Sequence, residues 1–146
     1  MHLSRRIIVL AGAAALLLGA TVLAWTIYSE RERSAQIALG QQLYGAYCAS
    51  CHGAGLQGEP DWQSPKPDGL MPAPPHDASG HTWHHSDEEL FRITKFGMAA
   101  VVPNHRSAMP AFGGALSDRE IEATLEYIKS TWSERERAYQ RERSRL

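Results

Sequence analysis

The feature that most constrains this chain is the motif Cys48-Ala49-Ser50-Cys51-His52, which contains both of its cysteines. Two thiols three positions apart lie on one helical turn, so they can bond to the two vinyl groups on one edge of a haem. A histidine directly after the second thiol then lies beneath the iron and can bind it from one side. The motif therefore predicts one covalently bound haem c, held through Cys48 and Cys51, with His52 as an iron ligand.

Three other interpretations share parts of this motif. A thioredoxin-like redox motif needs a βαβ context, and no strand pattern precedes Cys48. A structural zinc site needs a second pair of ligands at a compatible spacing, and the chain has no further cysteine. Coincidence is the third, but C-x-x-C-H in a chain with two cysteines is specific enough to favour haem attachment.

A six-coordinate haem needs a second axial ligand, and Met109 is the best candidate. It lies in a loop of its own between two predicted helices, where Pro110 restricts the backbone. Met98 directly follows Gly97 at a predicted helix end, where a methionine is more typical of core packing. The other candidates are Met71 and the histidines at 76, 81, 84, 85 and 105.

We therefore predict that His52 and Met109 bind the iron from opposite sides. Such a pair raises the reduction potential, because the soft sulfur favours ferrous iron. A fully ligated iron has no open position for a substrate, which favours electron transfer over catalysis. An enzyme or gas sensor with an open sixth position is the alternative.

The N-terminus carries an uncharged, apolar run from Ile7 to Ile27. As a helix it would reach about 31 Å, close to the hydrocarbon core of a bilayer at roughly 30 Å. Trp25 and Tyr28 lie where interfacial aromatic residues are expected. We predict a transmembrane anchor over residues 7–28. A cleaved signal peptide is the alternative, although its apolar core is usually only about 7–15 residues long. Both interpretations predict that the rest of the chain is exported.

Two capping boxes, S-x-x-E, mark helix starts in the remainder of the chain. Ser86 with Glu89 begins a helix that Gly97 closes, and Ser117 with Glu120 begins the last one. The last helix buries apolar residues at helical spacing, and the residues after 132 are a charged, solvated extension of it. These buried residues are Ile121, Leu125, Ile128 and Trp132. Residues 53–85 and 98–116 are predicted as long loops, and the exported part is therefore all-helical.

Histidines 76, 81, 84 and 85 lie close together in sequence beside Trp83. A second metal site, for example for copper, is one interpretation of this cluster. Hydrogen bonding to haem propionates, or capping of the helix at Ser86, is the interpretation we favour. The formal net charge of −1 gives no reason to expect a nucleic acid partner.

The segment from about Ala35 to Trp132 resembles a class I c-type cytochrome domain. In that family a helix with a glycine and then an aromatic residue, here Gly40 and Tyr44, leads into the haem motif. The last helix crosses the first at that glycine and offers an aromatic residue, here Tyr127. Met109-Pro110 matches the family's methionine loop, while the proline-rich loop 53–85 has no clear counterpart.

The apolar run at the N-terminus predicts a single transmembrane helix before this domain. The resemblance itself implies a small cytochrome c-like helical domain around one covalent haem. It implies a one-electron carrier that is not an enzyme, working with membrane-bound or periplasmic redox proteins, or else an electron-entry subunit of a larger oxidoreductase. We expect it in a bacterial inner membrane, single-pass, with the haem domain on the periplasmic side and residues 7–28 in the bilayer. The expected segments are a short cytoplasmic N-terminus (1–6), the transmembrane anchor (7–28), a linker (29–34), the cytochrome c domain (35–132) and a charged helical tail (133–146).

Overall fold

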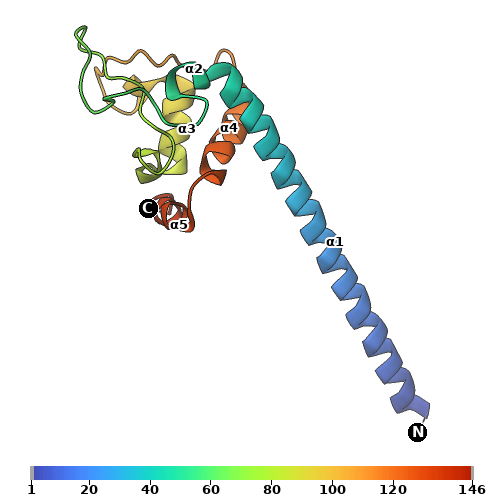
Figure 1. Cartoon of the computed structure of the whole chain (residues 1–146). Coiled ribbons are helices and arrows are strands. Elements are labelled where there is room, and N and C mark those ends of the chain that lie inside the picture. Colours follow the sequence, from blue (N-terminus) through green and yellow to red (C-terminus); the bar gives the residue numbers. More distant parts are fainter. Residues whose placement is uncertain (1, 146) are drawn as a thin grey trace. The chain divides into compact units, whose positions relative to one another are not determined.

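The computed structural model describes the backbone of residues 2–145, and the side chains of residue 12 and of residues 14–145. Every regular element in this range is a helix, which confirms the predicted all-helical class (Figure 1). The chain divides into two compact units, the first ending at Ala35 and the second comprising Gln36–Leu146. The side chains of the expected cytoplasmic N-terminus, residues 1–6, lie outside the described residues.

The prediction of a transmembrane helix over residues 7–28 is wrong. Within the residues that the structure describes, no helix combines the length and the apolar character needed to cross a bilayer. Helix α1 (His2–Tyr47) is long, but it continues without a break through the charged residues 30–33 of the expected linker.

Two further expectations depended on this helix and are corrected with it. A single-pass localisation in a bacterial inner membrane, with the haem domain on the periplasmic side, is not supported. Contact with the lipid bilayer through residues 7–28 is not supported either. The haem motif and the predicted helices after it all lie in the second unit.

Helices α3 (Asp87–Phe96) and α4 (Asp118–Ser130) begin as the sequence predicts. In each, the N-cap serine accepts a hydrogen bond from the backbone of the glutamate three residues on, and that glutamate accepts one from the serine backbone. α3 ends at Gly97, whose φ of 84° lies in the left-handed region that favours glycine. A short 3₁₀ helix, η2 (Met98–Ala100), follows, and Figure 1 shows α3 and α4 side by side.

The core of this unit lies between α4, the end of α1 and the adjoining loops. It includes all four apolar residues predicted for the last helix, of which Ile121 is fully buried and Trp132 is 3% exposed. Burying such side chains contributes about 1.5–3 kcal/mol each to stability. The buried cluster comprises Tyr44, Leu56, Leu90, Phe112, Leu116, Ile121, Leu125, Ile128 and Trp132.

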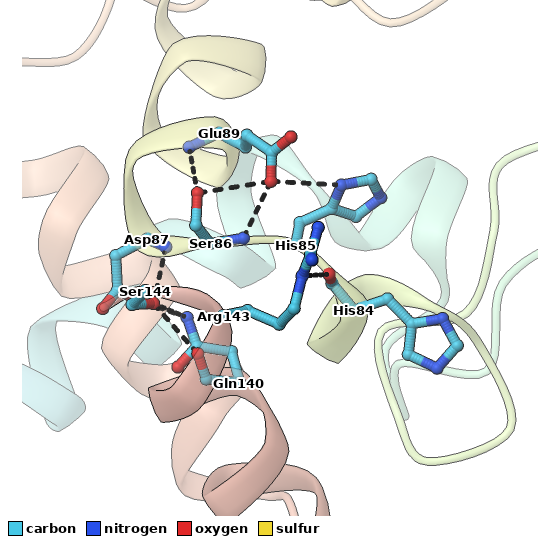
Figure 2. A network of polar contacts seen from close by, with 8 residues as sticks. All are labelled: His84, His85, Ser86, Asp87, Glu89, Gln140, Arg143 and Ser144. Carbon is cyan, nitrogen blue, oxygen red and sulfur yellow. Dashed lines mark hydrogen bonds and ion pairs between the residues drawn. The ribbon is translucent and has the colours of Figure 1, made fainter. Parts of the chain in front are cut away.

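The charged tail is a separate helix that docks on the domain, whereas the sequence predicts a solvated extension. α4 stops at Ser130, and a third capping box at Ser133 and Glu136 begins α5 (Glu134–Arg143). Glu136 and Gln140 are buried, and Figure 2 shows how the end of α5 meets the start of α3. The Gln140 side-chain amide donates to the Asp87 carboxylate at 2.9 Å, and the Arg143 guanidinium donates to the His84 carbonyl at 3.2 Å.

Candidate functional site

The C-x-x-C-H motif forms a single helical turn directly after α1. Helix α2 spans Ala49–His52, and the Cys48 carbonyl accepts hydrogen bonds from the backbone of Cys51 at 3.1 Å and of His52 at 2.9 Å. Both cysteines are free thiols. Cys48 is partly buried against the core, while Cys51 is exposed. The two thiols therefore lie on one turn, as thioether attachment along one edge of a haem requires.

The thiol of Cys48 does not have the properties of a redox-active dithiol. Burial, followed by the neighbouring Cys51, raises the pKa of Cys48 to about 11. Thiol-disulfide chemistry requires a thiolate, and redox-active C-x-x-C cysteines have lowered pKa values. This observation disfavours the thioredoxin-like interpretation of the motif.

His52 is held in one defined orientation. Its side chain is only 7% exposed, and its Nδ1 lies 2.8 Å from the Pro74 carbonyl oxygen. Burial lowers the pKa of His52, although the Pro74 carbonyl acts in the opposite direction. A neutral ring that donates from Nδ1 leaves Nε2 with a free lone pair, which is the form that binds a metal.

The loop 53–85 brings Pro74 to His52 by folding back on itself. Glu59 donates its backbone N–H to the Ala73 carbonyl at 2.9 Å, and its carboxylate accepts the Ala73 N–H at 2.6 Å and the Lys66 ammonium at 2.8 Å. Gly58 donates to the His52 carbonyl at 2.8 Å, with a φ of 68°. A Cβ on Gly58 would lie 2.5 Å from the backbone nitrogen of Pro75, so only glycine allows this approach.

A second histidine, His76, lies against His52. The two imidazoles stack with ring centroids 4.0 Å apart and planes inclined by 24°. Burial, followed by the charge that His52 can carry, lowers the pKa of His76 to about 3. The edge of the Tyr44 ring also meets His76, at a centroid distance of 6.2 Å. The sequence placed His76 in the histidine cluster, and nothing in its spacing indicated this contact.

Met109 borders the same buried cluster as Cys48. The loop that carries it is tied to the end of α3, because Phe112 and Gly113 donate their backbone N–H groups to the carbonyls of Thr94 at 3.0 Å and Lys95 at 2.9 Å. Met71, a rejected candidate ligand, is 42% exposed. Met98 lies in η2 and is partly buried. Because Met109 and Cys48 border the same buried cluster, the methionine loop and the haem motif share one core.

The histidine cluster does not gather into a metal site. Among the residues that the structure describes, no three His, Cys, Asp or Glu side chains are grouped so that they could hold a metal ion. His81 stacks instead on Trp62, with centroids 5.3 Å apart, and His84 packs on Trp83. The buried nitrogens His81 Nδ1 and Trp83 Nε1 have no hydrogen-bond partner within the described residues. Such atoms normally find one, and a haem carboxylate is a suitable acceptor for Trp83.

Comparisons with known proteins match the part of the chain that contains this site. Residues 35–128 match the family model described as cytochrome C oxidase, cbb3-type, subunit III. The chain is similar to cytochrome c6 of Tetradesmus obliquus, with 35% identity over 98 residues, covering 65% of this chain and 90% of the relative. Cytochrome c6 of Picosynechococcus sp. is 32% identical over 95 residues, covering 65% and 73%. No solved structure gives a significant match.

Proposed function

The chain belongs to the class I c-type cytochromes, and on that premise we propose that it carries single electrons through a haem held by its C-x-x-C-H motif and by Met109. Members of this family are electron carriers, not enzymes, with one covalently bound c-type haem. Their partners are other redox proteins. The proposal concerns which residues of this chain hold the haem and what each contributes.

Cys48 and Cys51 form the two thioether bonds in this proposal. Both are free thiols on a single helical turn, as the two vinyl groups on one haem edge require. Cys48 borders the core and Cys51 faces solvent, so this haem edge would lie at the surface. A haem edge at the surface suits electron transfer to a docked protein, because electron transfer does not require a small substrate to enter the site.

His52 would hold the haem iron through its Nε2. The hydrogen bond from Nδ1 to the Pro74 carbonyl selects the tautomer and increases the electron density on the ligating nitrogen. Burial keeps the imidazole neutral and therefore able to bind. This buried, oriented imidazole beside two thiols is the observation that carries the proposal.

Met109 would hold the iron through its thioether sulfur as the second protein ligand. Its contact with the core cluster that also borders Cys48, and the fastening of its loop to α3, support this role. When bound, the haem supplies an iron that cycles between Fe(III) and Fe(II). Held by His52 and Met109, the iron would have no position open to oxygen or water, and the Met109 thioether would favour the ferrous state and raise the potential.

The mass and spectrum of the purified holoprotein test this proposal. Denatured protein should weigh the polypeptide plus one haem, and the reduced spectrum should contain a c-type α band. Cys48→Ala and Cys51→Ala should each lower the yield of stably attached haem, whereas Ser50→Ala, within the same motif, should not. A wild-type protein that loses all haem on denaturation would contradict the proposal.

An electron-entry subunit of a larger oxidoreductase is the second candidate. It is supported by the family model that covers residues 35–128, whose description names an oxidase subunit. Affinity purification of the tagged, full-length protein from detergent-solubilised cells separates the two functions. A stoichiometric oxidase complex would favour the subunit, and a haem protein recovered alone would favour the free carrier.

A further inference from the structure

The face of the His52 ring is covered by the ring of His76. The centroid distance of 4.0 Å and the inclination of 24° mean that the two imidazoles are in contact over their faces. The hydrogen bond from Nδ1 to Pro74 constrains one edge of the His52 ring. A single hydrogen bond tolerates tens of degrees of rotation, so the bond alone does not fix the ring plane. A second ring against the face restricts that rotation.

His76 is itself fixed by neighbours other than His52. Its Nδ1 lies 2.8 Å from the Thr82 hydroxyl oxygen, and that hydroxyl donates to the Pro75 carbonyl at 3.3 Å. The Thr82 hydroxyl has one proton and donates it to the Pro75 carbonyl, so His76 Nδ1 is the donor in its contact with the Thr82 oxygen. Thr82 is buried, so the pair is not in exchange with bulk water.

The backbone of His76 is held just as firmly. Its N–H donates to the Leu56 carbonyl at 2.8 Å, and its carbonyl accepts the Trp132 indole N–H at 2.7 Å. Leu56 and Trp132 both belong to the buried cluster. The residue that carries the stacked ring is therefore anchored to two members of the core.

We propose that His76 is a positioning residue for the iron ligand, and that its stacked ring sets the rotational orientation of the His52 imidazole. The inference rests on the proposed function, since it treats His52 as an axial ligand. It has a second consequence for the site. The stacked ring keeps water from one face of His52, and a dry environment disfavours the additional positive charge of the ferric state. His76 therefore raises the reduction potential.

Three variants of the haem-loaded protein test this inference. His76→Ala removes the stacked ring, His76→Phe retains an aromatic face, and Thr82→Val keeps the imidazole but removes its hydrogen-bond partner. One measurement is the proton NMR spectrum of the ferric protein, in which the order of the four haem methyl shifts depends on the orientation of the axial imidazole plane. The other is the midpoint potential.

His76→Ala should change the methyl order and shift the potential downward, and Thr82→Val should cause a smaller change in the same direction. His76→Phe should retain the wild-type order. An unchanged spectrum and potential in His76→Ala, or a change in His76→Phe as large as in His76→Ala, would overturn the inference. If His76→Ala does not incorporate haem, the other two variants decide, and an unchanged Thr82→Val spectrum overturns the inference. A wild-type protein without covalent haem would instead contradict the proposed function.

Discussion

Gly40 meets Ala123 where α1 crosses α4, and the contact leaves no room for a Cβ atom on the glycine. A Cβ built there would overlap the Ala123 carbonyl oxygen and lie 2.9 Å from the Cβ of Tyr127. A glycine within a helix costs about 1 kcal/mol relative to alanine, and the close crossing offsets that cost. Tyr44 follows one turn later on the same helix, and its carbonyl accepts the backbone N–H of Cys48 at 2.9 Å, so the crossing also sets the direction in which the haem motif leaves α1.

Gly40→Ala should therefore destabilise the protein by about 2–3 kcal/mol, because it overpacks a contact between two backbones. Gly45→Ala is the matched control in the same helix, since a Cβ there meets nothing within 4 Å. It should stabilise the protein by about 0.5–1 kcal/mol. Urea unfolding of the holoprotein, followed by far-ultraviolet circular dichroism, measures both. Similar effects of the two substitutions would contradict a tight crossing.

Met109→Ala should open the sixth coordination position of the haem iron. The ferric protein should lose the weak near-infrared band that a sulfur ligand produces, the potential should fall, and the ferrous protein should bind carbon monoxide. Met98→Ala, in the 3₁₀ helix after α3, is the matched control and should retain the band. Loss of the band in Met98→Ala, with the band intact in Met109→Ala, would mean that Met98 and not Met109 is the sulfur ligand.

Gln140→Ala should destabilise the protein by about 1–2 kcal/mol, because it removes a buried amide that donates to Asp87 and to the Ser144 hydroxyl. Arg141→Ala, the adjacent position, is the control. Arg141 is exposed and pairs with Glu134 on its own helix, so its removal should cost less than about 0.5 kcal/mol. Thermal or urea unfolding compares them. Equal, small effects would mean that α5 contributes little to the fold in solution.

The stability of the protein should fall on acidification, in part through Asp87. Burial raises the pKa of Asp87, but the Lys129 ammonium at 2.8 Å and the hydrogen bonds from Gln140 and Ser144 outweigh burial and lower the pKa below its ordinary value. A carboxyl whose folded-state pKa is lowered stabilises the fold above its unfolded pKa, and this contribution is lost as the pH falls through the folded pKa.

Asp87→Asn should therefore lower the free energy of unfolding near neutral pH, and the difference should shrink as the solution is acidified and the pH falls through the folded pKa of Asp87. The carboxyl is half exposed, so the effect at neutral pH should be less than about 1 kcal/mol. Urea unfolding of both proteins across this pH range gives the difference directly. A difference that grows toward low pH would have the wrong sign for this ion pair.

The features that could be predicted from the sequence depend on neighbouring residues. The starts of α3 and α4 follow from a serine and a glutamate three positions apart, and the turn of the haem motif follows from its own spacing. The crossing at Gly40 was predicted through the family resemblance, which named Tyr127 but not Ala123. Met109 as a ligand stays a prediction.

The features that were missed depend on contacts between residues far apart in the sequence. Pro74 and His76 reach His52 through a loop without periodicity, which is shaped by a carboxylate at Glu59. The docking of α5 gave no hydrophobic signal, because two of its buried residues, Glu136 and Gln140, are polar. The transmembrane prediction rested on apolar length and on the positions of Trp25 and Tyr28, and it did not anticipate that α1 continues through charged residues.

Three helices of this domain begin with the same four-residue arrangement, at Ser86, Ser117 and Ser133. Their starting points are thus set before any distant part of the chain arrives. Helices of 10 to 13 residues are nonetheless marginal on their own in water, so they last only once they are packed. A newly made chain would accordingly have its nucleation points in place while the turn at Cys48 and Cys51 is still open to modification.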